Sequence, residues 1–226
     1  MEHTVITIAR SYGSGGRTLG KLLAKELGIH CYDRELLRMA SEQSGINEAL
    51  FGEVDEKVKS LPLFGISKKI YKGEIFPPES DEFVSDDNLF NYQAKIIKEV
   101  AAEESCVIIG RCADFILKDN PDVVRLFFYA PKEDCIARVK TQNGGTEKEI
   151  IRKIEKTDKY RSDYYRYHTG KDWNDSRNYD FCLNTASMSY EKLVAVVKAY
   201  IEQYRETAYA FRCVENYIMH CMTLIS

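Results

Sequence analysis

Residues 4–28 read TVITIARSYGSGGRTLGKLLAKELG, and this stretch carries the strongest indication of the fold. Its first six residues are mostly β-branched and predict a short buried strand. Glycines interrupt that pattern, and leucines then recur at the three- and four-residue spacing of an amphipathic helix. The helical pattern ends at Gly28. The sequence therefore predicts a strand, a glycine-rich loop and a helix in direct succession.

Further along the chain, short apolar runs alternate with helical patterns. Strands that alternate with helices favour a parallel α/β sheet covered by helices on both faces. The expected strands are 29–32, 106–109, 123–130 and 181–183, and the expected helices include 34–44 and about 89–100.

The composition excludes several classes of protein. The 226 residues contain 32 Lys or Arg and 35 Asp or Glu, a net charge of −3, which argues against a nucleic acid polymer or an acidic membrane as partner. The seven cysteines are an odd number without a C-x-x-C pair, which favours reduced thiols. No signal-peptide pattern or apolar run of about 18 residues is found in the sequence, so we expect a cytoplasmic protein.

The length favours one domain with an appendage. We expect that domain to span residues 1–205, with an inserted cap at about 45–88, where glycines and prolines break the pattern. The last segment, 206–226, is expected to form a docking helix or tail. Its apolar positions, which begin at Val214, leave assembly into a homo-oligomer open.

The glycine-rich loop has the chemistry of a phosphate site. Glycines let backbone N–H groups turn toward an anion, and the start of a helix adds a positive partial charge. The candidate donor phosphate-binding residues are Gly13, Ser14, Gly15, Gly16, Arg17 and Thr18. The alternative is a glycine-rich turn between strand and helix that binds no ligand.

Two registers relate the loop to the phosphate-loop pattern G-x-x-x-x-G-K-[ST]. In the favoured register Gly16 is the second glycine, Arg17 replaces the lysine, and Thr18 offers its hydroxyl to Mg²⁺, while Ser11 replaces the first glycine. Counted from the strand without a gap, Gly16 instead falls at the lysine position. The first register is favoured because it supplies a cation, although a planar guanidinium keeps the charge of lysine and not its geometry.

Several blocks together resemble the cytidylate kinase-like family of P-loop proteins. They are ITIARSYGSGGRTLGKLLAKELGIHCYDRELL (6–37), VIIGRCADFIL (107–117), DKYRSDYYRYHTGKDW (158–173) and NYDFCLNT (178–185). The resemblance covers about residues 4–200. It implies a three-layer α/β/α P-loop NTPase-like fold with a parallel central sheet, a monophosphate-binding insertion and a helical lid.

The resemblance also implies an acceptor site. Asp33 would hold Mg²⁺ through water and Arg34 would bind the acceptor phosphate; the alternative is that Asp33 caps the next helix. Arg111 follows a glycine at the end of a strand, where ligands of open α/β sheets gather. The kinase motif there is Gly-Arg-Asp, but Cys112 takes the Asp place, and Asp114 follows as a second candidate or as half of a surface ion pair.

The segment 143–172 is the expected lid, with Gly144 and Gly145 as a hinge and Thr146 as the N-cap of its helix. Helical phase places Arg161 on the apolar face of that helix. Arg161 and, further along, Arg166 are the candidates to neutralise the transferred phosphoryl group. Asp158 would orient Arg161 or pair with it.

The resemblance implies a kinase that transfers the γ-phosphoryl group of ATP, with Mg²⁺, to a nucleoside monophosphate such as CMP. The catalytic residues would be Arg17, Arg111, Arg161 and Arg166. No acidic residue stands at the end of the strand 106–109, so the metal site has fewer candidate protein ligands. Two alternatives stay open: a nucleotide-binding sensor without turnover, and a P-loop kinase for a small molecule that is not a nucleotide.

Overall fold

The computed structural model of the chain describes residues 3–56, 71 and 73–223, and the side chains of 53–56 and 208–223 lie outside that description. Its centre is a parallel sheet in the strand order β2-β3-β1-β4-β5. The strands are β1 (Val5–Arg10), β2 (His30–Tyr32), β3 (Cys106–Ile109), β4 (Val123–Tyr129) and β5 (Phe181–Asn184). Each expected strand is confirmed, and β1 lies in the middle of the sheet.

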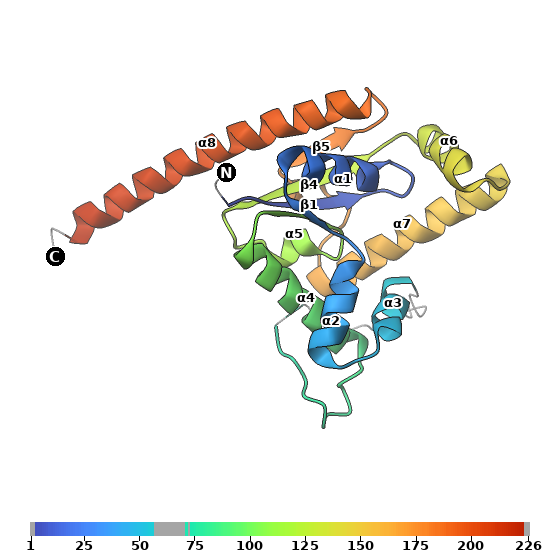
Figure 1. Cartoon of the computed structure of the whole chain (residues 1–226), viewed down its shortest axis with the longest axis horizontal. Coiled ribbons are helices and arrows are strands. Elements are labelled where there is room, and N and C mark those ends of the chain that lie inside the picture. Colours follow the sequence, from blue (N-terminus) through green and yellow to red (C-terminus); the bar gives the residue numbers. More distant parts are fainter. Residues whose placement is uncertain (1–2, 57–70, 72, 224–226) are drawn as a thin grey trace.

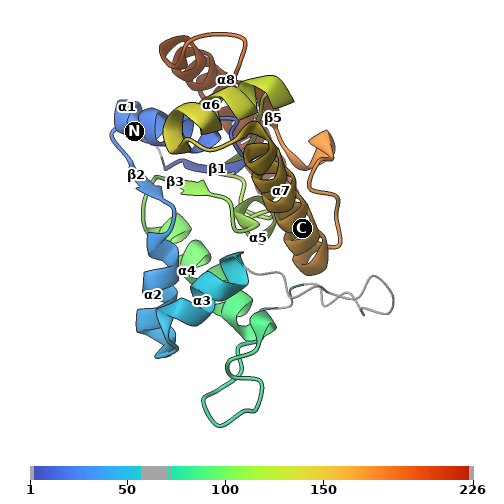
Figure 2. The same ribbon diagram turned by 90° about the vertical axis from the view of Figure 1, so that its right-hand side faces the viewer.

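Helices cover both faces of this sheet, as expected (Figures 1 and 2). Helices α1 and α8 lie on one face, and α4 and α5 lie on the other. The helices are α1 (Gly16–Leu27), α2 (Glu35–Ser44), α3 (Glu48–Glu56), α4 (Asp86–Glu103), α5 (Ala113–Ile116), α6 (Lys132–Asn143), α7 (Glu147–Thr169) and α8 (Tyr190–Thr223). The predicted three-layer α/β/α architecture is confirmed.

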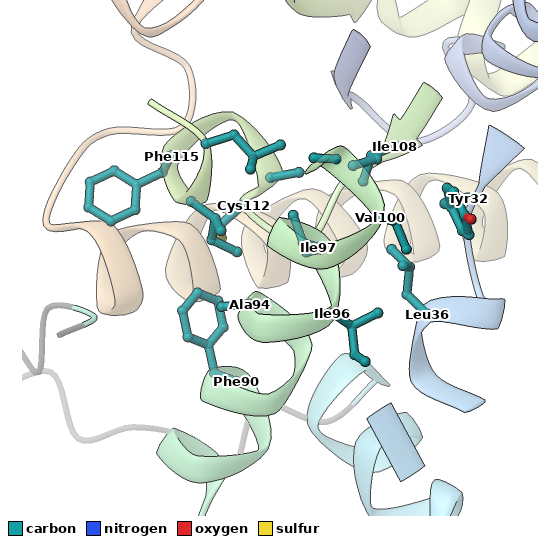
Figure 3. Packing of buried hydrophobic residues seen from close by; sticks show 14 of the residues in the cluster. Tyr32, Leu36, Phe90, Ala94, Ile96, Ile97, Val100, Ile108, Cys112 and Phe115 are labelled. Atoms are coloured by element: carbon teal, nitrogen blue, oxygen red, sulfur yellow. The ribbon is translucent and has the colours of Figure 1, made fainter. Parts of the chain in front are cut away.

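Alternation along β1 divides the core into two halves. Ile6 and Ile8 pack toward α1 and α8, whereas Val5 and Ala9 pack on the opposite face of the sheet. On that second face, side chains of α4 such as Phe90 meet residues of β3 and α5 (Figure 3). Burial on both faces fixes the register of β1, and so fixes where the glycine-rich loop leaves the sheet.

Helix ends follow the predicted signals in two of three cases. Gly28 ends α1 in the left-handed conformation, with a φ of 67°. Thr146 caps α7 in a capping box with Glu149, as its position predicted. The alternative in which Asp33 caps α2 is wrong, because Arg34 is the N-cap and the Asp33 carboxylate pairs with Arg17.

The described part of segment 45–88, the expected insertion, contains a helix that the sequence did not predict. This helix, α3, begins just after Asn47, whose side chain accepts the N–H of Ala49, and it buries Phe51 in the core. Its helical signal is short and is interrupted by Gly52, which explains why periodicity missed it. Residues 57–70 and 72 of the insertion lie outside the described residues.

Helix α8 runs through residue 205 without a break, so the expected boundary between 205 and 206 falls inside one helix. The apolar docking positions from Val214 onward lie outside the described side chains. In the part of the chain that was searched, no helix has both the length and the apolar character needed to cross a bilayer. The five cysteines whose side chains are described are free thiols.

Candidate active site

The glycine-rich loop leaves the carboxyl end of β1, between the ends of β3 and β4. In a parallel sheet this edge is where ligands bind. Gly15 is the N-cap of α1 with a φ of 80°, and a Cβ at this position would overlap the hydroxyl of Tyr190, the first residue of α8. Both the left-handed backbone and the contact with Tyr190 therefore require glycine here.

The carbonyl groups of the loop are turned outward by side chains from other elements. Arg138 of α6 donates from Nη1 to the Ser14 carbonyl oxygen at 2.6 Å, and the hydroxyl of Thr185 donates to the same oxygen. Because C=O and N–H point in opposite directions across a planar trans peptide, the N–H of Gly15 points to the other side. Among the described residues no acceptor takes the backbone N–H groups of Gly13, Gly15, Arg17 and Thr18.

Helix α7 holds the first residues of the loop. Asp158 accepts the N–H of Tyr12 at 2.7 Å, and Arg161 donates from Nη1 to the Arg10 carbonyl oxygen at 2.9 Å. Arg161 also pairs with Asp158 at 3.3 Å, which confirms that pairing. Burial raises the pKa of Asp158, while the hydrogen bond from Tyr12 and the charge of Arg161 oppose the shift. Arg161 thus supports the loop backbone in this conformation.

Arg166 lies apart from this contact. Its side chain is 60% exposed and its guanidinium is 3.6 Å from the carboxylate of Asp172. The two arginines that the sequence analysis assigned to a lid therefore have different surroundings.

Arg17 and Asp33, expected to serve the donor phosphates and the metal, form an ion pair with each other. Nε of Arg17 donates to Oδ2 of Asp33 at 2.5 Å, with the arginine side chain 51% exposed and the aspartate 13% exposed. Thr18 is exposed in the same first turn of α1. Among the residues searched, no three His, Cys, Asp or Glu side chains are grouped so as to hold a metal ion.

Arg111 occupies a strained backbone at the end of β3. Gly110, Arg111 and Cys112 all have positive φ, with values of 77°, 58° and 54°. Two consecutive non-glycine residues in this region are uncommon and cost energy that the surroundings must compensate. The Nε of Arg111 donates to the Asp33 carbonyl oxygen and its Nη1 to Oε1 of Gln93, each at 3.2 Å. The structure thus brings the side chain of Arg111 beside the backbone of Asp33.

Gln93 on α4 is 1% exposed, and its Nε2 has no hydrogen-bond acceptor in the described part of the chain. A buried amide donor without an acceptor is costly and marks a site that a ligand can satisfy.

The other two acceptor candidates, Asp114 and Arg34, differ in their burial. Asp114 is buried and accepts the Tyr165 hydroxyl at 2.6 Å, so the alternative of a surface ion pair is wrong. Burial raises the pKa of Asp114 to about 6, against the lowering effect of that hydrogen bond. Arg34 is exposed at the N-cap of α2.

Several site residues were missed by the sequence analysis. Gln93 had a readable signal, since it is a polar residue between Leu89 and Ile97 on the apolar face of a helix. Arg138 and Thr185 had none, because their contacts with the loop join residues 124 and 171 positions apart.

Comparison with known proteins agrees with this geometry. The model of the cytidylate kinase-like family matches residues 5–187. This chain belongs to the cytidylate kinase-like family. A cytidylate kinase of Pyrococcus horikoshii is 28% identical over 202 residues, which cover 89% of this chain and 90% of the relative.

Solved structures agree with the fold. An uncharacterized protein from Eubacterium ventriosum is 27% identical, with a TM-score of 0.64 over 88% of this chain and 98% of that one. A shikimate kinase from Bacteroides thetaiotaomicron has a TM-score of 0.52 at 17% identity, over 88% of this chain and 98% of its own, and shows the shared fold. The resemblance read from the sequence blocks is therefore confirmed at the level of family and fold.

Proposed function

We propose that this member of the cytidylate kinase-like family transfers the γ-phosphoryl group of ATP to a nucleoside monophosphate, with a CMP-like acceptor. The observation that carries the proposal is the loop after the central strand. Its carbonyls are held by Arg138 and Thr185, and its amides at Gly13 and Gly15 have no acceptor among the described residues. Such a preformed set of N–H donors suits a polyphosphate.

On the donor side, the backbone N–H groups of Gly13 and Gly15 would bind the β-phosphate, joined by those of Ser14 and Gly16, which in this structure donate within the loop. Arg17 would add positive charge at the rim. Thr18 and Asp33 would hold Mg²⁺ that arrives with the nucleotide, which supplies further charge neutralisation when bound. One hydroxyl and one carboxylate fit an ion whose other ligands are phosphates and water. Arg17 must release Asp33 for this binding, because the two now pair.

On the acceptor side, Arg111 and Arg34 would bind the monophosphate. Hydrogen bonds from Arg111 to the Asp33 carbonyl oxygen and to Gln93 orient its guanidinium, which can bind a phosphate in a bidentate way. Asp114 would support the acceptor site indirectly, because its carboxylate accepts the hydroxyl of Tyr165 and so links α5 to α7. The buried amide of Gln93 is suited to bind a polar group of the acceptor.

The segment 143–172, which contains α7 and its junction with α6, would be the lid, and the insertion at 45–88 would cover the acceptor. Gly144 and Gly145, with positive φ, join the two helices. Arg161 and Arg166 would bring positive charge to the transferred phosphoryl group when the lid closes. Phosphoryl transfer needs mainly placement, charge neutralisation and exclusion of water, and each of these has a group of residues here.

One observation favours a second function, a nucleotide sensor without turnover. The ion pair of Arg17 with Asp33 engages the two side chains expected to serve the donor and the metal, and β3 ends in Ile109 and Gly110 without an acid. A protein with this arrangement can bind a nucleotide and lack an efficient transfer step.

A turnover assay separates the two functions. Full-length protein is incubated with ATP, Mg²⁺ and one candidate acceptor at a time, chosen from the nucleoside monophosphates and from small alcohols. We expect ADP and the corresponding diphosphate to form with a pyrimidine monophosphate. ATP binding without ADP release for any acceptor supports the sensor, and transfer to an alcohol alone supports a kinase for another metabolite.

A further inference from the structure

Arg10 is the last residue of β1 and directly precedes the glycine-rich loop. It is partly buried, at the sheet edge where the carboxyl ends of β1 and β3 meet. The sequence analysis did not single out Arg10, because a strand-terminal arginine is usually a solvated surface residue.

The side chain of Arg10 passes over the first residue of α1. A Cβ built on Gly16 would lie 2.7 Å from Cβ of Arg10 and 3.3 Å from its Cγ. At the far end, a Cβ built on Gly110 would overlap Nη1 of Arg10. The arginine therefore runs from the start of α1 to the end of β3, and both glycines leave room for it.

The path of the Arg10 side chain favours the second register of the phosphate-loop pattern, which is counted from the strand without a gap. The strand ends at Arg10 and the helix begins at Gly16, so Arg10 falls at the first glycine of the pattern and Gly16 at its lysine. The chain thus carries a glycine where the pattern has its cation and a cation where the pattern has its glycine. The two changes are complementary, since the side chain of Arg10 fills the space that a side chain at residue 16 needs.

We propose that Arg10 replaces the missing lysine of the phosphate loop and binds the β- and γ-phosphates of the donor nucleotide. This inference rests on the proposed function, because it names the cation of the same donor site. A guanidinium can bind two phosphate oxygens at once, whereas an ammonium acts as a point charge. Arg10 is a binding residue for the polyphosphate, and Arg17 is a second cation at the exposed rim.

The surroundings hold Arg10 in place. Arg161 of α7 donates to its carbonyl oxygen at 2.9 Å, and the charge of Arg10 also acts on the nearby carboxylate of Asp158. The helix that would form the lid is therefore linked to the cation of the donor site through its backbone and through a shared acid.

The test compares MgATP and adenosine binding by calorimetry in full-length variants. Arg10→Gln is expected to weaken MgATP binding by about 10- to 100-fold, the effect of losing charge-assisted hydrogen bonds. Adenosine affinity should change less than threefold, because adenosine has no phosphate. Arg10→Lys should keep most of the MgATP affinity, and Arg38→Gln, an exposed arginine of α2 paired with Glu42, should change neither.

An exchange of the two residues tests the geometry. Gly16→Lys alone should abolish MgATP binding, since its Cβ meets Arg10. The double variant Arg10→Gly with Gly16→Lys should recover most of the affinity, with a small adjustment at Phe128, whose Cβ lies 3.0 Å from the new Cβ. Circular dichroism and thermal melting confirm that each variant is folded before binding is measured.

Unchanged MgATP affinity in folded Arg10→Gln, or an equal loss for adenosine and MgATP, overturns the role of Arg10. If in that case Arg17→Gln weakens MgATP, the other register holds and the proposed function stands. If the parent protein binds no nucleotide at all, the proposed function itself has failed, and this result is distinct from a defect in one variant.

Discussion

The donor and acceptor sides of the candidate site are built differently. The donor loop is held by side chains from three elements remote in sequence, through Arg138 of α6, Asp158 of α7 and Thr185 after β5. The proposed acceptor side is made of side chains: Arg111 donates to the Asp33 carbonyl oxygen and to Gln93, and Arg34 is exposed. A binding site made of fixed backbone groups needs many supports, whereas a site made of side chains can change with single substitutions.

The largest expected effect is on the donor side, from Arg138→Ala. This change removes donors to the carbonyl oxygens of Ser14 and Thr185. We expect a loss of about 2 to 3 kcal/mol in MgATP binding free energy, because two partly buried carbonyl groups lose charged donors. Calorimetry measures the affinity for MgATP. The KM for the acceptor should be nearly unchanged at saturating ATP.

Arg177→Ala is the matched control, since this arginine is 87% exposed and pairs only locally with Asp175 among its described contacts. An equal loss of MgATP affinity in both variants would contradict the distinction between the two sides. An equal effect of Arg138→Ala on MgATP affinity and on the KM for the acceptor would contradict it as well.

The next effect concerns the packing of α7 against α4 and depends on pH. His168 stacks on Phe90 of α4 at 3.8 Å between ring centroids, and burial lowers its pKa from 6.5 to about 3. The folded state therefore binds this proton less readily than the unfolded state, so stability is full above pH 6.5 and falls as the pH drops toward 3. His168→Phe keeps an aromatic ring and removes the titration.

Urea unfolding at pH 7 and pH 4.5 measures this effect. The parent protein should lose about 2 kcal/mol more than His168→Phe over that interval. The raised pKa of Asp114 acts with the opposite sign, but it is present in both proteins and cancels in the difference. Equal losses in the two proteins would show that His168 is already solvated or charged in the fold.

The smallest effect is expected from Gln93→Leu. The substitution keeps the buried volume but removes the acceptor of Arg111 and the buried amide. The KM for the acceptor should rise about tenfold, the cost of about one hydrogen bond to a charged group, with MgATP affinity unchanged. Steady-state kinetics at varied acceptor concentration measures it, with Gln43→Leu, an exposed glutamine paired with Glu99, as the control. A change in MgATP affinity alone would assign Gln93 to the donor side.

Much of the fold could be predicted because its signals are local. The strand 106–109 and the cap at Thr146 follow from neighbouring residues, and the structure confirms both. The pairing of Arg17 with Asp33 could not be predicted, because it depends on how α1 and β2 are placed beside each other. The path of Arg10 across Gly16 likewise needs coordinates, although the unusual glycine at residue 16 was visible in the sequence.

The central claim is that the backbone amides of the glycine-rich loop bind the polyphosphate of a nucleotide. Titration of labelled protein with MgATP, followed through the backbone N–H resonances of Gly13, Gly15 and Gly16, tests it most directly. We predict saturable shifts at these three glycines, and the same shifts with inorganic triphosphate. Shifts confined to other parts of the chain, with the three glycine resonances unmoved at saturation, would contradict it.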